Sequence, residues 1–382
     1  MKIIPIFKPS MSNVEVAAIK KVLFSGWLGL GPKTQEFEEK FADYSGVKYA
    51  VGLNSGTAAL HLALKVLNLK PGDEVITTAL TFVSTNHAIL YNGAKPVFAD
   101  IYEDTMTLDV EDINRKITKK TKVILPVHYG GHPADLDEIM GIAKENNIRL
   151  IEDAAHACGA RYKGQIVGSF GDLTCFSFHA VKNLSVGEGG MITTNNKRFA
   201  ERLKRLRWLG INKTTWDRSK NKKAYNWEYR VDEVGFKEHL DDIHSAIGLV
   251  QLKKLERLNR RRQEIVNFYN KALNKIKWIN TPVDRPYVKN SHHLYVIKVP
   301  PEIRGRLIDY LAKRGVSTGV HYFPNHLYKV YKPYRVSLPV TEDVYRRIIT
   351  LPLYPDLRSS QLETIINAIY DFDRKLAKLT PR

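Results

Sequence analysis

Short apolar runs rich in β-branched and aromatic residues alternate with amphipathic stretches between residues 49 and 194. The apolar runs predict strands, and stretches whose apolar positions recur every three or four residues predict helices. The predicted strands are 49–53, 74–78, 95–100, 122–127, 148–151, 173–178 and 190–194, and the predicted helices include 12–24, 58–67, 82–91, 135–146, 197–208 and 243–273. Strands that alternate with helices in this way favour an α/β fold, in which a mostly parallel sheet has helices on both faces.

A second pattern begins near residue 281, where Thr281-Pro-Val-Asp-Arg-Pro interrupts the helical periodicity. The elements predicted after this break are strand 293–299, helix 302–314, strand 316–321 and helix 360–376. A chain of 382 residues is long enough for two domains. We expect a large α/β domain at 12–248 and a smaller α+β domain at 249–382, with residues 1–11 packed against the smaller one.

Residues 210–240 are polar and aromatic, and they follow neither the helical nor the strand period. So long a segment without clear periodicity favours a functional loop or an excursion toward a partner.

The chain is strongly basic, with 59 Lys and Arg residues against 40 Asp and Glu residues and a formal charge of +19. This excess suits either nucleic acid or a diphosphate-linked substrate. The basic residues are spread along predicted helices, as in 197–207 and 257–262, and no recognised nucleic-acid-binding motif accompanies them. We therefore expect no nucleic-acid partner.

The apolar runs are short and interrupted, so we expect no membrane span. Pro5 and Pro9 break the N-terminal segment before a secretory apolar region could form, and we expect a cytoplasmic protein. Cys158 and Cys175 form no C-x-x-C pair and lie in no nucleophile motif. They are predicted to be reduced core residues.

Two short motifs suggest sites that their surroundings exclude. His128 and His132 have an H-x-x-x-H spacing. Two imidazoles at that spacing converge on a metal only when the segment is helical, and the glycine pair that follows a predicted strand disfavours a helix here. We expect no metal there and interpret the motif as an active-site loop. Gly26-Trp-Leu-Gly-Leu-Gly-Pro lacks the G-x-G-x-x-G spacing and follows a predicted helix, which excludes a Rossmann dinucleotide site.

Lys182 lies in an irregular loop between two predicted strands, and Gly187, Gly189 and Gly190 allow tight turns beside it. Burial disfavours the ammonium form of a lysine, and a neutral amine can form a Schiff base with an aldehyde. An isolated lysine in such a position is far more often a surface lysine beside a hairpin, so other residues must decide.

A second candidate is Asp153, which follows Glu152 at the end of an apolar strand and precedes His156. Carboxylates at the carboxyl end of a buried strand point into the ligand crevice of an open α/β sheet. Asp153 could pair with a protonated pyridine nitrogen, as pyridoxal phosphate requires of its protein.

The third candidate is the turn Ser55, Gly56 and Thr57, which joins a predicted strand to a predicted helix. Free N–H groups and the helix dipole favour a phosphate at such a helix N-terminus, although the turn alone is no more than a good helix cap. Phosphate cradle, ring carboxylate and amine together describe a site for pyridoxal phosphate.

These motifs occur in an order that resembles the DegT/StrS type of nucleotide-sugar aminotransferase, a family of fold-type-I pyridoxal-phosphate enzymes. The resemblance extends along nearly the whole chain and implies an aspartate-aminotransferase-like fold. It is carried by Ser25-Gly-Trp, Gly31-Pro-Lys-Thr, Asn54-Ser-Gly-Thr-Ala-Ala-Leu, Glu152-Asp-Ala-Ala-His, Ser177-Phe-His-Ala-Val-Lys182, Gly187-Glu-Gly-Gly and Leu351-Pro-Leu-Tyr-Pro.

The resemblance implies that Lys182 binds pyridoxal phosphate as a Schiff base and that Asp153 keeps the ring nitrogen protonated. The cofactor then alternates with its pyridoxamine phosphate form. His156 is expected to bond the cofactor's 3-hydroxyl, and Ser55, Gly56, Thr57 and Ser177 to bind its phosphate. Phe82 is at the position where the family stacks an aromatic ring on the cofactor, although an ordinary packed phenylalanine fits the sequence equally well.

The family is also expected to form an obligate homodimer with shared active sites. An asparagine in the region of residues 210–240 contacts the partner's cofactor phosphate in the family, whereas His239 occupies that position here. Trp27, Glu188 and His321 are weaker candidates for substrate contact, and His321 could instead be a structural histidine at a strand end.

Gly187-Glu-Gly-Gly resembles the version found in family members that aminate the fourth carbon of a sugar. We therefore expect a 4-keto-6-deoxyhexose or 4-keto pentose linked to a nucleoside diphosphate, with glutamate as amino donor. The 4-amino product would serve a cell-surface glycan such as lipopolysaccharide or O-antigen. A 3-keto sugar, a keto-cyclitol and a non-catalytic regulatory protein that binds the cofactor remain as alternatives.

Overall fold

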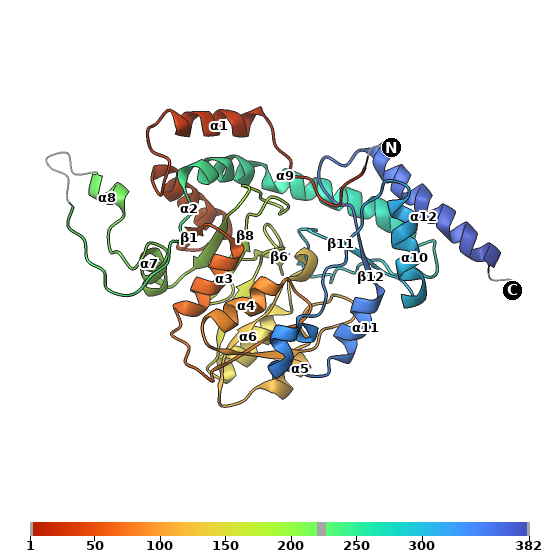
Figure 1. Ribbon diagram of the computed structural model, residues 1–382, viewed down its shortest axis with the longest axis horizontal. Coiled ribbons are helices and arrows are strands. Elements are labelled where there is room, and N and C mark those ends of the chain that lie inside the picture. Colours follow the sequence, from red (N-terminus) through yellow and green to blue (C-terminus); the bar gives the residue numbers. More distant parts are fainter. Residues whose placement is uncertain (1–2, 220–226, 380–382) are drawn as a thin grey trace.

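The computed structural model describes residues 3–219 and 227–379, and a seven-stranded sheet lies at its centre (Figure 1). The strand order is β1-β9-β8-β5-β4-β2-β3. The strands are β1 (Tyr49–Leu53), β2 (Glu74–Thr78), β3 (Lys95–Ala99), β4 (Thr121–Leu125), β5 (Arg149–Asp153), β8 (Leu173–Ser177) and β9 (Gly190–Thr194). Strand β9 runs antiparallel to β1 and β8, while every other neighbouring pair is parallel. The predicted mostly parallel sheet is confirmed.

Helices cover both faces of this sheet, because successive residues of a strand point to opposite sides. Ile192 of β9 packs in the apolar cluster that contains residues of α3 and α7, whereas the adjacent Met191 packs with Phe37 and Phe41 of α2. The helices of this part are α1 (Asn13–Leu23), α2 (Pro32–Ser45), α3 (Gly56–Lys65), α4 (Val83–Tyr91), α5 (Val110–Lys116), α6 (Leu136–Glu145), α7 (Lys197–Leu206) and α8 (Thr215–Ser219).

The C-terminal part is built on an antiparallel pair, β11 (Tyr295–Lys298) with β12 (Ile348–Leu351). Its helices are α10 (Pro301–Ala312), α11 (Pro339–Arg347) and α12 (Ser359–Leu379). The prediction of a strand at 316–321 is wrong. Val316 makes only an isolated bridge with Ile4, and Gly319 makes another with Thr350 of β12, so no continuous ladder forms. The bridge to Ile4 ties the N-terminal segment to this part, in the same apolar cluster as α10 and α12.

Helix α9 (Asp242–Leu273) runs without interruption through the predicted domain boundary at residue 248. Its first half packs on α1 and α2, while Ile265 and Tyr269 of its second half belong to the C-terminal apolar cluster. One continuous helix therefore connects the two parts, and the exact division into domains stays a prediction.

Smaller elements complete the part of the chain that the structure describes. They are a three-stranded sheet of β10 (Val288–Lys289), β6 (Arg161–Tyr162) and β7 (Gln165–Ile166), and the 3-10 helices η1 (Tyr129–Gly131), η2 (Asn325–Leu327) and η3 (Lys329–Tyr334). The predicted excursion at 210–240 contains α8 at the left edge of Figure 1, and residues 220–226 of it lie outside the described residues. None of the described helices has both the length and the apolar character needed to cross a bilayer.

Candidate active site

Asp153 lies at the carboxyl end of β5 and is only 3% exposed. Its Oδ2 accepts a hydrogen bond of 2.7 Å from the Thr85 hydroxyl, and its Oδ1 accepts one of 3.1 Å from the Ala155 N–H. Burial raises the pKa of Asp153, while these hydrogen bonds and the nearby Lys182 cation act in the opposite direction. The carboxyl group is thus oriented on both oxygens at the edge where the parallel strands end.

Lys182 lies in the loop between β8 and β9. Asn183, the next residue, holds this loop in place. Its side-chain amide donates to the Ser291 carbonyl at 2.7 Å and to the Asn259 side-chain oxygen at 2.9 Å. Burial lowers the pKa of Lys182 to about 8, and the negative charge of Asp153 only partly opposes this shift. The structure therefore holds a lysine whose neutral form is far more populated near neutral pH than that of an ordinary lysine.

The turn at residues 55–57 forms the N-terminus of α3. The Ser55 hydroxyl accepts a hydrogen bond of 3.0 Å from the Ala58 N–H, while the N–H groups of Gly56 and Thr57 precede the first bond within the helix. A Cβ atom on Gly190 would lie 2.3 Å from the Ser55 carbonyl oxygen, and one on Gly56 would lie 2.8 Å from the Ser177 Cβ. Glycine is thus needed at both positions for β8, β9 and the turn to approach one another.

Asp153, Lys182 and the turn at residues 55–57 line one cavity of about 410 Å³. That volume is in the range of small-molecule sites. Ten of the predicted site residues line it, from five separate segments of the chain: Ser55, Gly56, Thr57, Phe82, Asp153, His156, Ser177, Lys182, Glu188 and His321. The fold brings together residues that lie far apart in the sequence.

Near the opening of the cavity, Phe82 is 56% exposed and its ring lies 5.9 Å from that of Tyr322. Glu188 is also exposed, and its Oε1 lies 3.5 Å from the Nε2 of His179. His321 lies deeper, where its Nδ1 meets the Thr350 hydroxyl at 2.8 Å. Burial and the nearby Lys182 cation lower the pKa of His321 to about 4, so its ring is neutral near neutral pH.

Trp27 and His239 do not line this cavity. The indole N–H of Trp27 donates to the Leu30 carbonyl at 3.2 Å, and its ring lies 4.9 Å from that of Trp216. The His239 ring packs edge-on against Trp208 at 4.6 Å, and burial lowers its pKa to about 4. Within its own subunit, neither side chain reaches the group formed by Lys182 and Asp153.

The two histidines of the H-x-x-x-H motif bind different partners. The Nε2 of His128 lies 2.9 Å from the buried Glu152 carboxylate, and its Nδ1 accepts from the Ala134 N–H at 3.1 Å. His132 bonds the Pro133 carbonyl through Nδ1 at 2.7 Å and accepts from the Arg285 N–H at 3.2 Å through Nε2. All four ring nitrogens are engaged separately, and no candidate metal cluster occurs within residues 3–219 and 227–379.

Sequence reasoning missed several residues of the cavity, including Thr85, His293 and Tyr322. Thr85 could have been found from the sequence, because it is a polar residue in the first turn of the helix predicted at 82–91, which follows a predicted strand. Nothing local marks Tyr322 or His293, since their contacts with His156 depend on how the C-terminal part packs.

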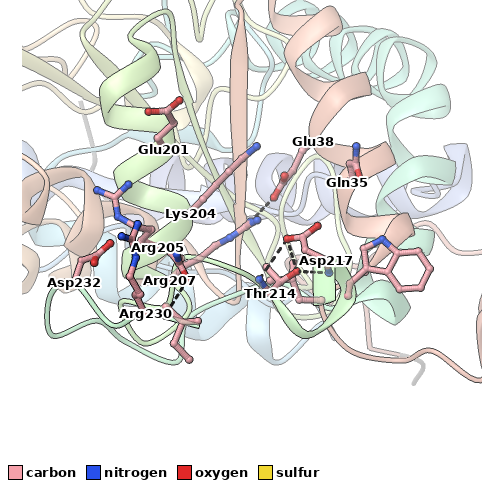
Figure 2. A pocket seen from close by; sticks show the side chains of 15 residues that line it. Gln35, Glu38, Glu201, Lys204, Arg205, Arg207, Thr214, Asp217, Arg230 and Asp232 are labelled. Atoms are coloured by element: carbon pink, nitrogen blue, oxygen red, sulfur yellow. Dashed lines mark hydrogen bonds and ion pairs between the residues drawn. The ribbon is translucent and has the colours of Figure 1, made fainter. Parts of the chain in front are cut away.

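A second cavity of about 410 Å³ lies between α2, α7 and residues 211–232 (Figure 2). Its lining has four acidic and four basic residues, and the Arg207 guanidinium bonds directly to the Glu38 carboxylate. It is lined by none of the predicted site residues. We therefore take the first cavity as the candidate active site.

Comparison with known proteins identifies the family of the chain. Residues 9–370 match the DegT/DnrJ/EryC1/StrS aminotransferase family. The chain is 39% identical to SpsC, a spore coat polysaccharide biosynthesis protein of Bacillus subtilis, over 96% of each chain. It is 42% identical to an uncharacterized protein of Methanocaldococcus jannaschii, again over 96% of each chain.

Solved structures agree over similar lengths. PseC of Helicobacter pylori, an aminotransferase of pseudoaminic acid biosynthesis, superposes with a TM-score of 0.92 at 29% identity, covering 98% of this chain and 100% of that one. Spr1654 of Streptococcus pneumoniae, a putative sugar aminotransferase solved in its pyridoxamine phosphate form, gives a TM-score of 0.91 at 34% identity over 99% of each chain. The chain therefore belongs to the DegT/DnrJ/EryC1/StrS aminotransferase family and is a pyridoxal-phosphate-dependent aminotransferase.

Proposed function

We propose that this aminotransferase transfers an amino group from glutamate to a 4-keto sugar linked to a nucleoside diphosphate, with pyridoxal phosphate held in the cavity that contains Lys182. One observation carries the proposal. Lys182, Asp153 and the open turn at Gly56 and Thr57 face a single cavity large enough for a small molecule.

The residues present fit the cofactor. Lys182 would bond the aldehyde carbon, Asp153 would pair with the ring nitrogen, and the N–H groups of Gly56 and Thr57 would hold the phosphate with the Ser177 hydroxyl. Because Gly190 has no side chain, β9 can pass close to the backbone of Ser55 and Gly56 in this turn. When bound, pyridoxal phosphate supplies an electron-accepting ring that stabilises negative charge on the carbon bearing the amino group.

Lys182 is suited both to bind the cofactor and to move a proton. With a pKa of about 8, roughly one molecule in ten carries the neutral amine at pH 7, against about one in three thousand at the ordinary value of 10.5. A base works best when its pKa is near the working pH. Lys182 would therefore take the proton from the amino-bearing carbon and return it to the neighbouring one.

The position of amination is inferred from Gly187-Glu-Gly-Gly, whose exposed Glu188 lies where a substrate would enter. SpsC is described as a protein of spore coat polysaccharide biosynthesis and PseC as an aminotransferase of pseudoaminic acid biosynthesis, which supports an amino-sugar product. We propose a 4-amino sugar used for a cell-surface glycan. Both cysteines are buried and free, which supports the expected cytoplasmic location.

A second copy of this chain is the proposed partner. Large apolar side chains are exposed near the excursion at 210–240, with Phe24 at 81%, Trp227 at 74% and Val234 at 85%. Exposed large apolar side chains of this kind are typical of surfaces that a partner covers. Because Trp27 and His239 lie outside their own subunit's cavity, we propose that they complete the active site of the second copy.

The experiment combines the purified protein with pyridoxal phosphate and glutamate, and follows visible absorbance and 2-oxoglutarate release. A panel of nucleoside-diphosphate 4-keto sugars, 3-keto sugars and a keto-cyclitol is then offered, and the aminated carbon is located by NMR. We expect turnover with a 4-keto sugar and none with the Lys182→Ala variant.

Turnover with only a 3-keto sugar or the cyclitol would contradict the proposed position. A Lys182-dependent visible band without any turnover would instead favour a regulatory protein. Analytical sedimentation tests whether two copies of the chain associate. A monomer with full activity would contradict the proposal that two subunits share their active sites.

A further inference from the structure

Asn183, the residue after Lys182, is only 3% exposed, and both polar atoms of its side chain have partners. Its amide nitrogen donates to the Ser291 carbonyl at 2.7 Å and to the Asn259 Oδ1 at 2.9 Å, while its Oδ1 lies 3.2 Å from the Nδ1 of His293. Because Oδ1 of an asparagine can only accept, His293 is the donor in the third bond. Three hydrogen bonds to distant segments therefore hold the main chain next to Lys182.

Two of these partners also hold the segment that follows β5. The Asn259 amide donates to the Cys158 carbonyl at 2.9 Å, and the Ser291 hydroxyl donates to the His156 carbonyl at 2.8 Å. A Cβ atom on Gly159 would lie 2.5 Å from the Asn259 Nδ2, so glycine is needed there for this close approach. Asn259 and Ser291 thus connect the loop that contains Lys182 to the segment at 154–158.

Four buried side chains form this network, which we call the polar clamp: Asn183, Asn259, Ser291 and His293. The two loops that it joins contain groups that must match in position. Asp153, at the start of one loop, would determine where the cofactor ring lies, and Lys182 in the other supplies the amine. Proton transfer depends steeply on such geometry, because a misplacement of about 1 Å can slow a reaction about a hundredfold.

We propose that Asn183 is a positioning residue, which acts through the polar clamp to fix the distance between the Lys182 amine and the ring that Asp153 would hold. The role of Lys182 in moving a proton rests on the proposed function. The hold of the clamp on the two loops does not, since all of its bonds join atoms of the protein.

The first test measures amide hydrogen exchange of the Asn183→Leu protein without cofactor. Leucine branches at the same carbon as asparagine but can form none of the three hydrogen bonds. We expect exchange to become about tenfold faster or more in residues 179–187 and also in residues 154–158, because the clamp connects these segments. Faster exchange in residues 179–187 alone, or in neither segment, would overturn the proposal.

Asn92→Leu is the matched control. The Asn92 amide also donates to two carbonyl oxygens, those of His61 at 3.1 Å and Ala88 at 2.9 Å, and Asn92 does not line the cavity. This variant should leave exchange in both segments unchanged, and thermal unfolding compares the stability of the two variants. Equal acceleration of both segments in Asn92→Leu would contradict a specific role for the clamp.

The second test mixes the Asn183→Leu protein, loaded with pyridoxal phosphate, with glutamate and follows a single turnover by stopped-flow absorbance. The maximal rate should fall about tenfold or more, while the half-saturating glutamate concentration stays within about twofold, because the clamp affects position and not binding. Deuterium on the 2-carbon of glutamate should slow the variant by at least the factor seen in the wild type. A vanishing isotope effect, or a loss confined to glutamate affinity, would overturn the proposal.

Ser291→Ala is a milder variant that separates the two sides of the clamp. It removes the hydroxyl that bonds the His156 carbonyl and keeps the Ser291 carbonyl to which Asn183 donates. Exchange should rise in residues 154–158, and the maximal rate should again fall. Combined with Asn183→Leu, its effect on the rate should be smaller than in the wild type, and additive effects would overturn the clamp.

Failure of the clamp and failure of the proposed function give different results. A wild-type protein that binds no pyridoxal phosphate or does not react with glutamate would contradict the proposed function. The exchange measurements need no cofactor, so they decide the role of the clamp in either case.

Discussion

The hydroxyl of Thr85 donates a hydrogen bond of 2.7 Å to the carboxylate of Asp153, and so joins the first turn of α4 to the end of β5. Thr85 is itself fixed by Thr81, whose hydroxyl lies 2.8 Å away. The orientation of the carboxylate that would meet the cofactor's ring nitrogen therefore depends on a threonine from another element.

Replacing Thr85 by valine should lower kcat/KM about tenfold or more, because a hydrogen bond to a charged group is lost at nearly constant shape. Thr85→Ser keeps the hydroxyl and should retain most activity. Thr77→Val is a suitable control, since the Thr77 hydroxyl bonds the Leu125 carbonyl at 2.9 Å and does not line the cavity. Equal losses in Thr85→Val and Thr77→Val, measured by steady-state kinetics, would argue against a specific role for Thr85.

The lowered pKa of Lys182 predicts how fast the cofactor-free protein captures pyridoxal phosphate. Only the neutral amine attacks the aldehyde, so the second-order rate constant should rise with pH and level off above about 8, well below the ordinary lysine value of 10.5. Stopped-flow absorbance measures this profile. Asp153 raises the pKa of Lys182, so Asp153→Asn should move the midpoint to lower pH. A midpoint near 10.5 would contradict the structure.

Gly190 allows β9 to pass directly behind the phosphate cradle. Gly190→Ala would place a methyl group 2.3 Å from the Ser55 carbonyl oxygen, so the turn must shift and the affinity for pyridoxal phosphate should fall at least about tenfold. Gly141→Ala in α6 meets no atom within 4 Å, and it should leave binding unchanged while slightly stabilising the helix. Fluorescence titration with the cofactor compares the two variants, and equal affinities would refute this role.

Glu152, which precedes Asp153 in β5, holds three neighbouring segments through hydrogen bonds. Its carboxylate accepts hydrogen bonds from the Thr174 hydroxyl at 2.6 Å and the Gly171 N–H at 2.8 Å, and it lies 2.9 Å from His128. Glu152→Leu leaves these buried groups without a partner and should lower the free energy of unfolding by about 2–5 kcal/mol.

The control for Glu152→Leu is Glu36→Leu, which breaks an exposed pair with Lys33 and should cost no more than about 1 kcal/mol. Urea denaturation measures both. Because the Glu152 carboxylate and the Ala134 N–H engage both ring nitrogens of His128, a chelator should leave the stability of the wild-type protein unchanged, and destabilisation by the chelator would contradict that interpretation.

Local patterns of the sequence predicted most of the central sheet. The strands 49–53, 74–78 and 190–194 coincide with β1, β2 and β9, because buried β-branched runs bounded by turn residues leave few alternatives. The C-terminal part was harder. Its predicted strand at 316–321 does not form, and β12 was not predicted, because pairing between segments far apart in the chain decides which short apolar run becomes a strand.

The sequence by itself determined the chemistry available to this protein. Lys182 between two strands, Asp153 at a strand end and the small-residue turn at 55–57 are local features, since strand ends, turns and helix N-termini are set by neighbouring residues. Only the tertiary structure decided how these groups are oriented. Thr85 meets Asp153 across 68 residues and Tyr322 meets His156 across 166, and contacts between distant segments exist only after the chain has packed. No local pattern encodes such a hydrogen bond, because each partner lies on an element whose position depends on the whole fold.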